Sequence, residues 1–218
     1  MKYLEFTDVE IHELKSEIIG ETFEILVKQP DPQILSLFGN KPLPVVYGTD
    51  ANLSAGGYIN TLEGLLLGGE IPPVLFIGIR YKLGDEPDFM QFVTSRTREF
   101  TPTEDVENQK LMEQMTLREV KGGGAENFLK FLTTELRDWV SERFNVSDDT
   151  TYIGDSMGGL FGLYTLFTEP RAFKRYVIGS PWQEWNHPKT FELEESYAEN
   201  NNDMAVSYTH LRAHETAY

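Results

Sequence analysis

The order of apolar and polar residues predicts an alternation of strands and helices. Residues 8–29 alternate apolar and polar positions on both sides of Gly20, a pattern typical of two antiparallel strands around a turn. Residues 44–48 and 73–79 are short apolar runs rich in β-branched residues, which favours strands buried on both faces. Residues 58–69 between them have helical spacing, so this part of the chain predicts a strand–helix–strand unit.

The second half of the chain continues this alternation. Apolar residues recur every fourth position from Glu126 to Phe144, which predicts a helix. Residues 151–153 predict a short strand, residues 160–167 an apolar helix, and residues 175–180 another strand. Right-handed crossovers between such strands give a mostly parallel central sheet with helices on both faces, so the predicted fold class is α/β.

Length and composition suit one globular domain of 218 residues. The formal net charge of −16 argues against nucleic acid or an anionic membrane as a partner. Cysteine is absent, which excludes disulfides, thiolate nucleophiles and cysteine-based metal sites. The first residues lack the apolar core of a signal peptide, and no run approaches the roughly 20 apolar residues of a membrane span. We therefore expect a cytoplasmic protein.

The most informative motif is Gly-Asp-Ser-Met-Gly at residues 154–158. It falls where a predicted strand ends and a predicted helix begins, which is the context of a nucleophile elbow. Side chains at Gly154 and Gly158 would collide with the neighbouring strand and helix. The turn would present the hydroxyl of Ser156 above the sheet and direct the N–H of Met157 toward a developing oxyanion. The alternative is a glycine-rich turn that only packs a helix against a strand.

Four segments of the chain read VVYGTDANL, REFTP, GGGAENFLKFLTTEL and GDSMGGLFGLYTLFTEPRAFKRYVIGSPWQEW. Together they resemble the esterase family of α/β-hydrolases that includes enterochelin and salmochelin esterases. The resemblance implies an α/β-hydrolase fold with an N-terminal antiparallel hairpin, a small-molecule ester as substrate, and no cofactor or metal.

The same resemblance assigns roles to individual residues. It implies that Ser156 is the nucleophile and that Met157 and Ala51 supply the two N–H donors of the oxyanion hole. Ala51 stands where the family usually has glycine after the aspartate. Trp182 and Trp185 would line a substrate mouth, with core packing as the alternative reading.

Other polar residues have simpler interpretations. We interpret Glu184 and His187 as loop residues, and Arg96 and Arg98 as arginines that hold a loop through carboxylate pairs. Residues 122–124 lack the Lys-Ser/Thr ending of a phosphate-binding loop and are expected to precede a helix. His210 and His214 have the spacing of paired zinc ligands on a helix, but no suitable third ligand accompanies them, so no metal site is predicted.

The hypothesis that follows is a serine hydrolase of carboxylic esters that works through an acyl-enzyme on Ser156. A noncatalytic binding module on the same fold and an acyltransferase are the alternatives. The particular ester and the oligomeric state are left open by the sequence.

The end of the chain carries a separate expectation. Residues 1–204 are interpreted as the N-terminal part of an α/β-hydrolase domain that lacks its C-terminal strands. Residues 205–218, AVSYTHLRAHETAY, resemble translated sequencing-adapter sequence and are expected to pack poorly as a non-native tail. Only one clear strand follows Ser156, whereas the catalytic acid and histidine follow later strands in this fold. We therefore expect Ser156 to lack a base and this chain to be inactive.

Overall fold

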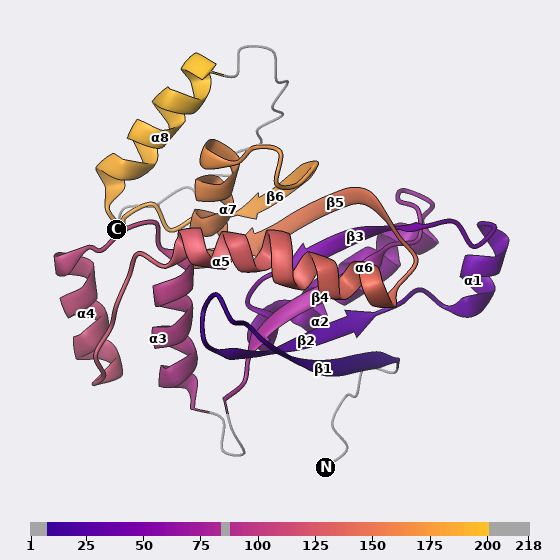
Figure 1. Cartoon of the computed structure of the whole chain (residues 1–218), viewed down its shortest axis with the longest axis horizontal. Coiled ribbons are helices and arrows are strands. Elements are labelled where there is room, and N and C mark those ends of the chain that lie inside the picture. Colours follow the sequence, from indigo (N-terminus) through magenta and orange to yellow (C-terminus); the bar gives the residue numbers. More distant parts are fainter. Residues whose placement is uncertain (1–7, 84–87, 201–218) are drawn as a thin grey trace, which may run out of the picture.

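A six-stranded, mostly parallel sheet forms the centre of the molecule (Figure 1). The computed structural model describes residues 8–83 and 88–200. The strand order is β1-β2-β4-β3-β5-β6; β1 and β2 form an antiparallel hairpin, β2 also pairs antiparallel with β4, and the remaining pairs are parallel. The strands are β1 (Val9–Lys15), β2 (Thr22–Lys28), β3 (Leu43–Gly48), β4 (Leu75–Tyr81), β5 (Val146–Asp155) and β6 (Arg175–Gly179).

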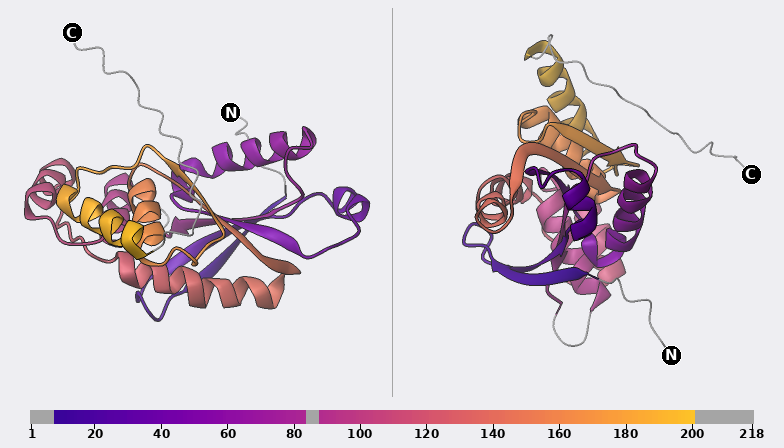
Figure 2. Two further views of the ribbon diagram at one scale, coloured as in Figure 1. Left: turned by 90° about the horizontal axis from the view of Figure 1, so that it is seen from above. Right: turned by 90° about the vertical axis from the view of Figure 1, so that its right-hand side faces the viewer.

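Helices cover both faces of this sheet. Seen from above, α2 lies on one face, and the helix formed by α5, η1 and α6 lies on the other (Figure 2). The helices are α1 (Pro32–Leu37), α2 (Ala51–Leu67), α3 (Phe89–Phe100), α4 (Val106–Thr116), α5 (Ala125–Phe131), the π-helical turn η1 (Leu132–Leu136), α6 (Arg137–Arg143), α7 (Met157–Thr168) and α8 (His187–Asn200).

The predicted hairpin, the parallel strands and the helix after Ser156 are confirmed. Two boundaries differ from the prediction. Strand β5 begins at Val146 because Val146 pairs with Leu43 of β3, ahead of a register shift over the polar residues 147–149, after which pairing resumes at Thr150. Helix α2 begins at Ala51, seven residues before the apolar stripe that predicted it. Its first turns consist mainly of small and polar residues that give no periodic signal.

The core is divided by the sheet into two clusters. The larger cluster contains aromatic side chains from several elements, among them Phe23, Phe100, Phe128 and Phe161. Phe161 of α7 packs against the rings of Phe100, Phe128 and Tyr152. The smaller cluster packs α2 against the opposite face of the sheet and consists of Leu26, Val46, Ala51, Ala55, Ile59 and Phe76. Central strands contribute to both clusters, which explains their continuous apolar runs.

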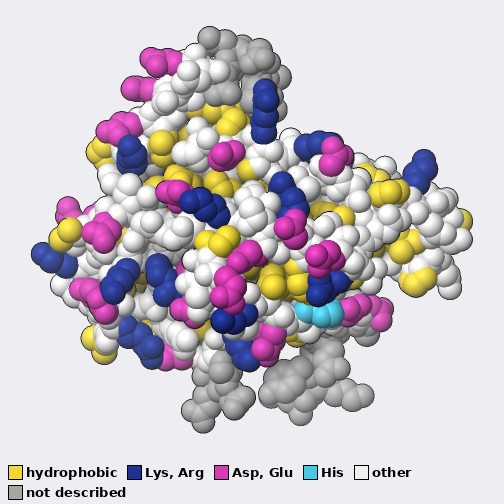
Figure 3. Space-filling view, in the orientation of Figure 1, with side chains coloured by type: hydrophobic (Ala, Val, Ile, Leu, Met, Phe, Trp, Pro, Cys, Tyr) yellow, Lys and Arg dark blue, Asp and Glu magenta, His cyan; other side chains and the backbone are white. Residues whose placement is uncertain are grey.

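The surface carries charges of both signs. On the face shown in Figure 3, acidic and basic side chains are interspersed. Across residues 8–83 and 88–200, no helix is both long and apolar enough to cross a membrane. The predicted non-native tail, residues 205–218, lies outside the described residues.

Candidate active site

Ser156 occupies the turn between β5 and α7 in a strained backbone conformation, with φ 58° and ψ −116°. Residues other than glycine rarely adopt such a conformation unless their surroundings enforce it. Three backbone hydrogen bonds do so here. The Ser156 N–H donates to the Gly179 carbonyl at 3.0 Å, and the Ser156 carbonyl accepts from the N–H groups of Leu160 and Trp182, each at 3.0 Å. The side chain itself is exposed.

Close contacts explain the glycines on either side of the serine. A Cβ atom at Gly154 would lie 2.4 Å from the Tyr152 hydroxyl and 2.6 Å from the Gly158 carbonyl oxygen. A Cβ atom at Gly158 would lie 2.6 Å from Oγ1 of Thr49. The expected collisions at both positions are therefore confirmed, and they come from a strand, a helix and the loop after β3.

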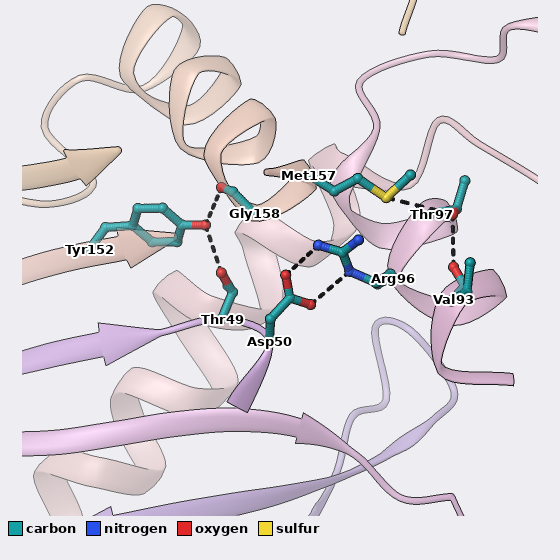
Figure 4. A network of polar contacts seen from close by, with 8 residues as sticks. All are labelled: Thr49, Asp50, Val93, Arg96, Thr97, Tyr152, Met157 and Gly158. Atoms are coloured by element: carbon teal, nitrogen blue, oxygen red, sulfur yellow. Dashed lines mark hydrogen bonds and ion pairs between the residues drawn. The ribbon is translucent and has the colours of Figure 1, made fainter. Parts of the chain in front are cut away.

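A buried hydroxyl network ties the start of α7 to the end of β3 (Figure 4). The Tyr152 hydroxyl donates to the Gly158 carbonyl at 2.6 Å and lies 3.1 Å from Oγ1 of Thr49. Tyrosine has one hydroxyl proton, so Thr49 is the donor in the second bond. Burial raises the pKa of Tyr152, so the phenol keeps that proton. Sequence reasoning missed this network, because nothing in the sequence distinguishes Tyr152 from other aromatic residues in buried strands.

The two predicted oxyanion donors begin two adjacent helices. Met157 is the first residue of α7 and Ala51 is the first residue of α2. The N–H groups in the first turn of a helix have no acceptor within that helix. They carry the positive end of the helix dipole and are suited to stabilise an anion. Gly158 and Thr49 bring these two helix ends together.

An ion pair holds the loop that leads into α2 (Figure 4). The guanidinium of Arg96 on α3 donates to both carboxylate oxygens of Asp50, at 2.8 and 2.5 Å. Burial raises the pKa of Asp50, and Arg96 opposes this effect. Arg98 pairs with Glu99 and with Glu21. The prediction that these two arginines hold a loop through carboxylates is confirmed.

The two tryptophans lie in different environments. Trp182 is half-buried, and its backbone N–H donates to the Ser156 carbonyl. Its ring packs edge-on against Trp185, with the ring centroids 5.8 Å apart. Trp185 is completely buried, and its indole N–H donates to the Thr103 carbonyl at 2.8 Å. Trp182 can therefore still face a substrate, whereas the position of Trp185 fits the packing alternative.

No imidazole contacts the serine hydroxyl among the residues that the structure describes. His12 lies on β1, where it binds Glu10 and packs against Trp139. His187 is the first residue of α8, rather than a loop residue, and its ring packs on Phe191. His210 and His214 lie outside the described residues. Glu184 is exposed in the loop before α8, where we expected it. In the same part of the chain, histidine and acidic residues form no group of three suited to hold a metal ion.

Comparison with known proteins identifies the family. Residues 16–211 match the family model described as "Putative esterase". The chain belongs to this esterase family. The ferri-bacillibactin esterase BesA of Bacillus subtilis is 36% identical over 154 residues, which cover 66% of this chain and 50% of that protein. A siderophore triacetylfusarinine C esterase of Aspergillus fumigatus is 29% identical over 175 residues, covering 77% and 53% respectively. The chain thus spans about half the length of these curated relatives.

A solved structure supports the same assignment. The crystal structure of the BES protein from Bacillus cereus matches with a TM-score of 0.73 and 25% identity, over 93% of this chain and 72% of that one. The chain therefore has the α/β-hydrolase fold, which confirms the predicted fold class and the family resemblance.

Alanine substitutions at two glycines, one in the serine turn and one in α2, test how tightly the serine turn is packed. Gly154→Ala should lower the free energy of unfolding by several kcal/mol, because its Cβ would overlap the Gly158 carbonyl oxygen, a backbone atom. Gly64→Ala is the matched control. A Cβ atom at this position in α2 would contact nothing within 4 Å, so alanine should stabilise the helix by about 0.5–1 kcal/mol. Urea denaturation measures both changes; equal effects would contradict the packing argument.

A second buried carboxylate near the site makes stability depend on pH. Glu99 on α3 accepts a hydrogen bond from Nε of Arg98, and its carboxylate is buried near Tyr81. Burial raises the pKa of Glu99 to about 7, although Arg98 acts to lower it. The folded protein therefore holds this proton more tightly than the unfolded chain does. The stabilising contribution is present below the ordinary pKa of 4.5 and is lost as the pH rises toward 7.

Glu99→Gln should remove this pH dependence. Between pH 5 and pH 8, wild type should lose up to about 3 kcal/mol of unfolding free energy relative to the variant. Urea denaturation of both proteins at the two pH values measures the difference. A difference that does not change with pH would show that Glu99 titrates normally.

Proposed function

We propose that this protein is a serine hydrolase that cleaves small-molecule carboxylic esters through an acyl-enzyme on Ser156. The observation that carries the proposal is the strained conformation of this exposed serine beside the N-termini of α2 and α7. A turn that only packed a helix against a strand would need the glycines but not a serine at positive φ. The curated relatives reported above are siderophore esterases, which supports ester hydrolysis as the reaction class.

The chemistry follows from this arrangement. Oγ of Ser156 forms a bond to the ester carbonyl carbon while its proton passes to a base. The carbonyl electrons move onto the oxygen, which the N–H groups of Met157 and Ala51 stabilise as an oxyanion. The bond to the alcohol oxygen then breaks, and the alcohol leaves with the proton. Water then attacks the acyl-enzyme carbonyl carbon in the same way, the bond to Oγ of Ser156 breaks, and the carboxylic acid is released.

The base is the part of this site that residues 8–83 and 88–200 do not supply. We propose that Ser156 reacts slowly in this chain, because no imidazole in the described residues contacts it. A serine that keeps its proton is a weak nucleophile, and loss of a triad member lowers the rate by several orders of magnitude. The oxyanion donors and the serine turn do not depend on that base, so a base supplied from solution should partly replace it.

Labelling with a fluorophosphonate tests both parts of the proposal. We expect slow labelling of Ser156, accelerated at least tenfold by free imidazole and more strongly above the pKa of imidazole, where the neutral base predominates. Mass spectrometry of tryptic peptides identifies the labelled residue.

Ser156→Ala should abolish the labelling. Ser180 is a serine control within the chain, since it is also exposed and at positive φ, 36°, but does not begin a helix. Equal labelling of Ser156 and Ser180, or none at either with imidazole present, would favour a noncatalytic binding module. If Ser156 is labelled, an added alcohol acceptor during ester turnover separates acyl transfer from hydrolysis.

A further inference from the structure

Aspartates precede four of the helices in residues 8–83 and 88–200, and three of these aspartates cap their helix. Asp31, Asp88 and Asp105 each accept a hydrogen bond from a first-turn N–H of α1, α3 and α4. This is the usual role of aspartate at such a position. Asp50, which precedes α2, makes no such bond. The exception is the helix that begins with the expected oxyanion donor.

The carboxylate of Asp50 is held elsewhere. Its two oxygens accept from Nε and Nη2 of Arg96, and both side chains are largely buried, at 6% and 15% exposure. The backbone of Asp50 is in the left-handed region, with φ 56° and ψ 31°. The three aspartates that cap have negative φ. Arg96 thus pairs with an aspartate whose backbone conformation differs from that of the three capping aspartates. Residues other than glycine adopt this left-handed conformation rarely.

The helix on the other side of the site has the same feature. Serine is also a favoured capping residue, yet Ser156 precedes α7 at positive φ and makes no capping bond. Each of the two helices that meet at the site is therefore preceded by a residue of a type that ordinarily caps, and in neither case does that side chain cap the helix. At Ser156 the backbone bonds to β6 and its following loop enforce this state. At Asp50 the side-chain interaction with an equivalent effect is the pair with Arg96.

We propose that Arg96 is a positioning residue that keeps the Asp50 carboxylate off the first turn of α2, so that no negative charge lies beside the Ala51 N–H, the second oxyanion donor. This role rests on the proposed function of Ser156. Without the guanidinium, the carboxylate would rotate to cap α2, as three other aspartates do. As at the other three aspartates, it would accept from the second or third N–H of the helix, and it would place a negative charge beside the Ala51 N–H, where the oxyanion forms.

Two variants separate this role from a purely structural one. Arg96→Met frees the carboxylate, whereas the double variant Arg96→Met with Asp50→Gly removes the competing carboxylate as well. Glycine also tolerates the positive φ at position 50. A structural ion pair would be lost equally in both. Under the proposal only the single variant has a carboxylate beside the oxyanion donor.

Amide NMR gives the first readout and does not depend on catalysis. In Arg96→Met, the N–H resonances of the first turn of α2 should move downfield as they acquire a carboxylate acceptor, and exchange with solvent at least tenfold more slowly. In the double variant they should not. Unchanged α2 resonances in a folded Arg96→Met protein would overturn the proposal.

Fluorophosphonate labelling in the presence of imidazole gives the second readout. Removal of one oxyanion donor typically costs 10²- to 10³-fold, and a carboxylate beside that donor should cost at least tenfold, so Arg96→Met should label Ser156 at least tenfold more slowly than wild type. The double variant should recover at least tenfold. Equal rates for the single and double variants would also overturn the proposal. If wild type does not label at all, the proposed function fails, and the NMR result still decides whether Arg96 keeps α2 uncapped.

Controls address folding. Arg80→Met removes another partly buried pair, with Glu24, and should label as wild type does. Circular dichroism checks that each variant is folded. If Arg96→Met is not folded, Arg96→Gln takes its place; because glutamine keeps a donor for one Asp50 oxygen but no charge, the same changes are expected at a smaller size.

Discussion

The site depends on the close approach of α7 to the end of β3. This approach requires the absence of a side chain at Gly158, because Oγ1 of Thr49 occupies the space that a Cβ atom would need. The Tyr152 hydroxyl then bridges Thr49 and the Gly158 carbonyl within the core. Two helix N-termini consequently lie side by side at the carboxyl edge of a parallel sheet, where α/β proteins commonly bind ligands.

Strain at this edge is maintained by interactions that come from elsewhere in the fold. The β6 strand fixes the backbone of Ser156 through Gly179, and α3 fixes Asp50 through Arg96. Both residues are at positive φ, and the side chain of neither caps the helix that follows, although both residue types ordinarily do so. The large aromatic core beneath α7 makes such strain tolerable, since it anchors the helix independently of its first turn.

Much of this architecture could be predicted from the sequence, because the relevant signals are local. Apolar runs bounded by glycine or proline located β3 and β4, and a four-residue apolar period located α5 through α6. The motif at residues 154–158 could be assigned to a strand–turn–helix because both flanking elements have strong patterns of their own. Helices α1, α3 and α4 were not predicted. An aspartate that can cap precedes each of them in the sequence. The apolar pattern that follows each aspartate is too short to distinguish a helix from a loop.

The sequence by itself determined the fold class, the family resemblance and the candidate nucleophile, because these depend on periodicity and on residues adjacent in the chain. Tertiary structure decided the partners of those residues. Arg96 meets Asp50 across 46 positions, and Trp185 donates to Thr103 across 82, which buries an indole that the sequence could equally place at the surface. Whether an aspartate caps its own helix or pairs with a distant arginine depends on which acceptor and donor the packed chain brings within reach. No local pattern encodes that choice, because both outcomes begin from the same residue type before a helix.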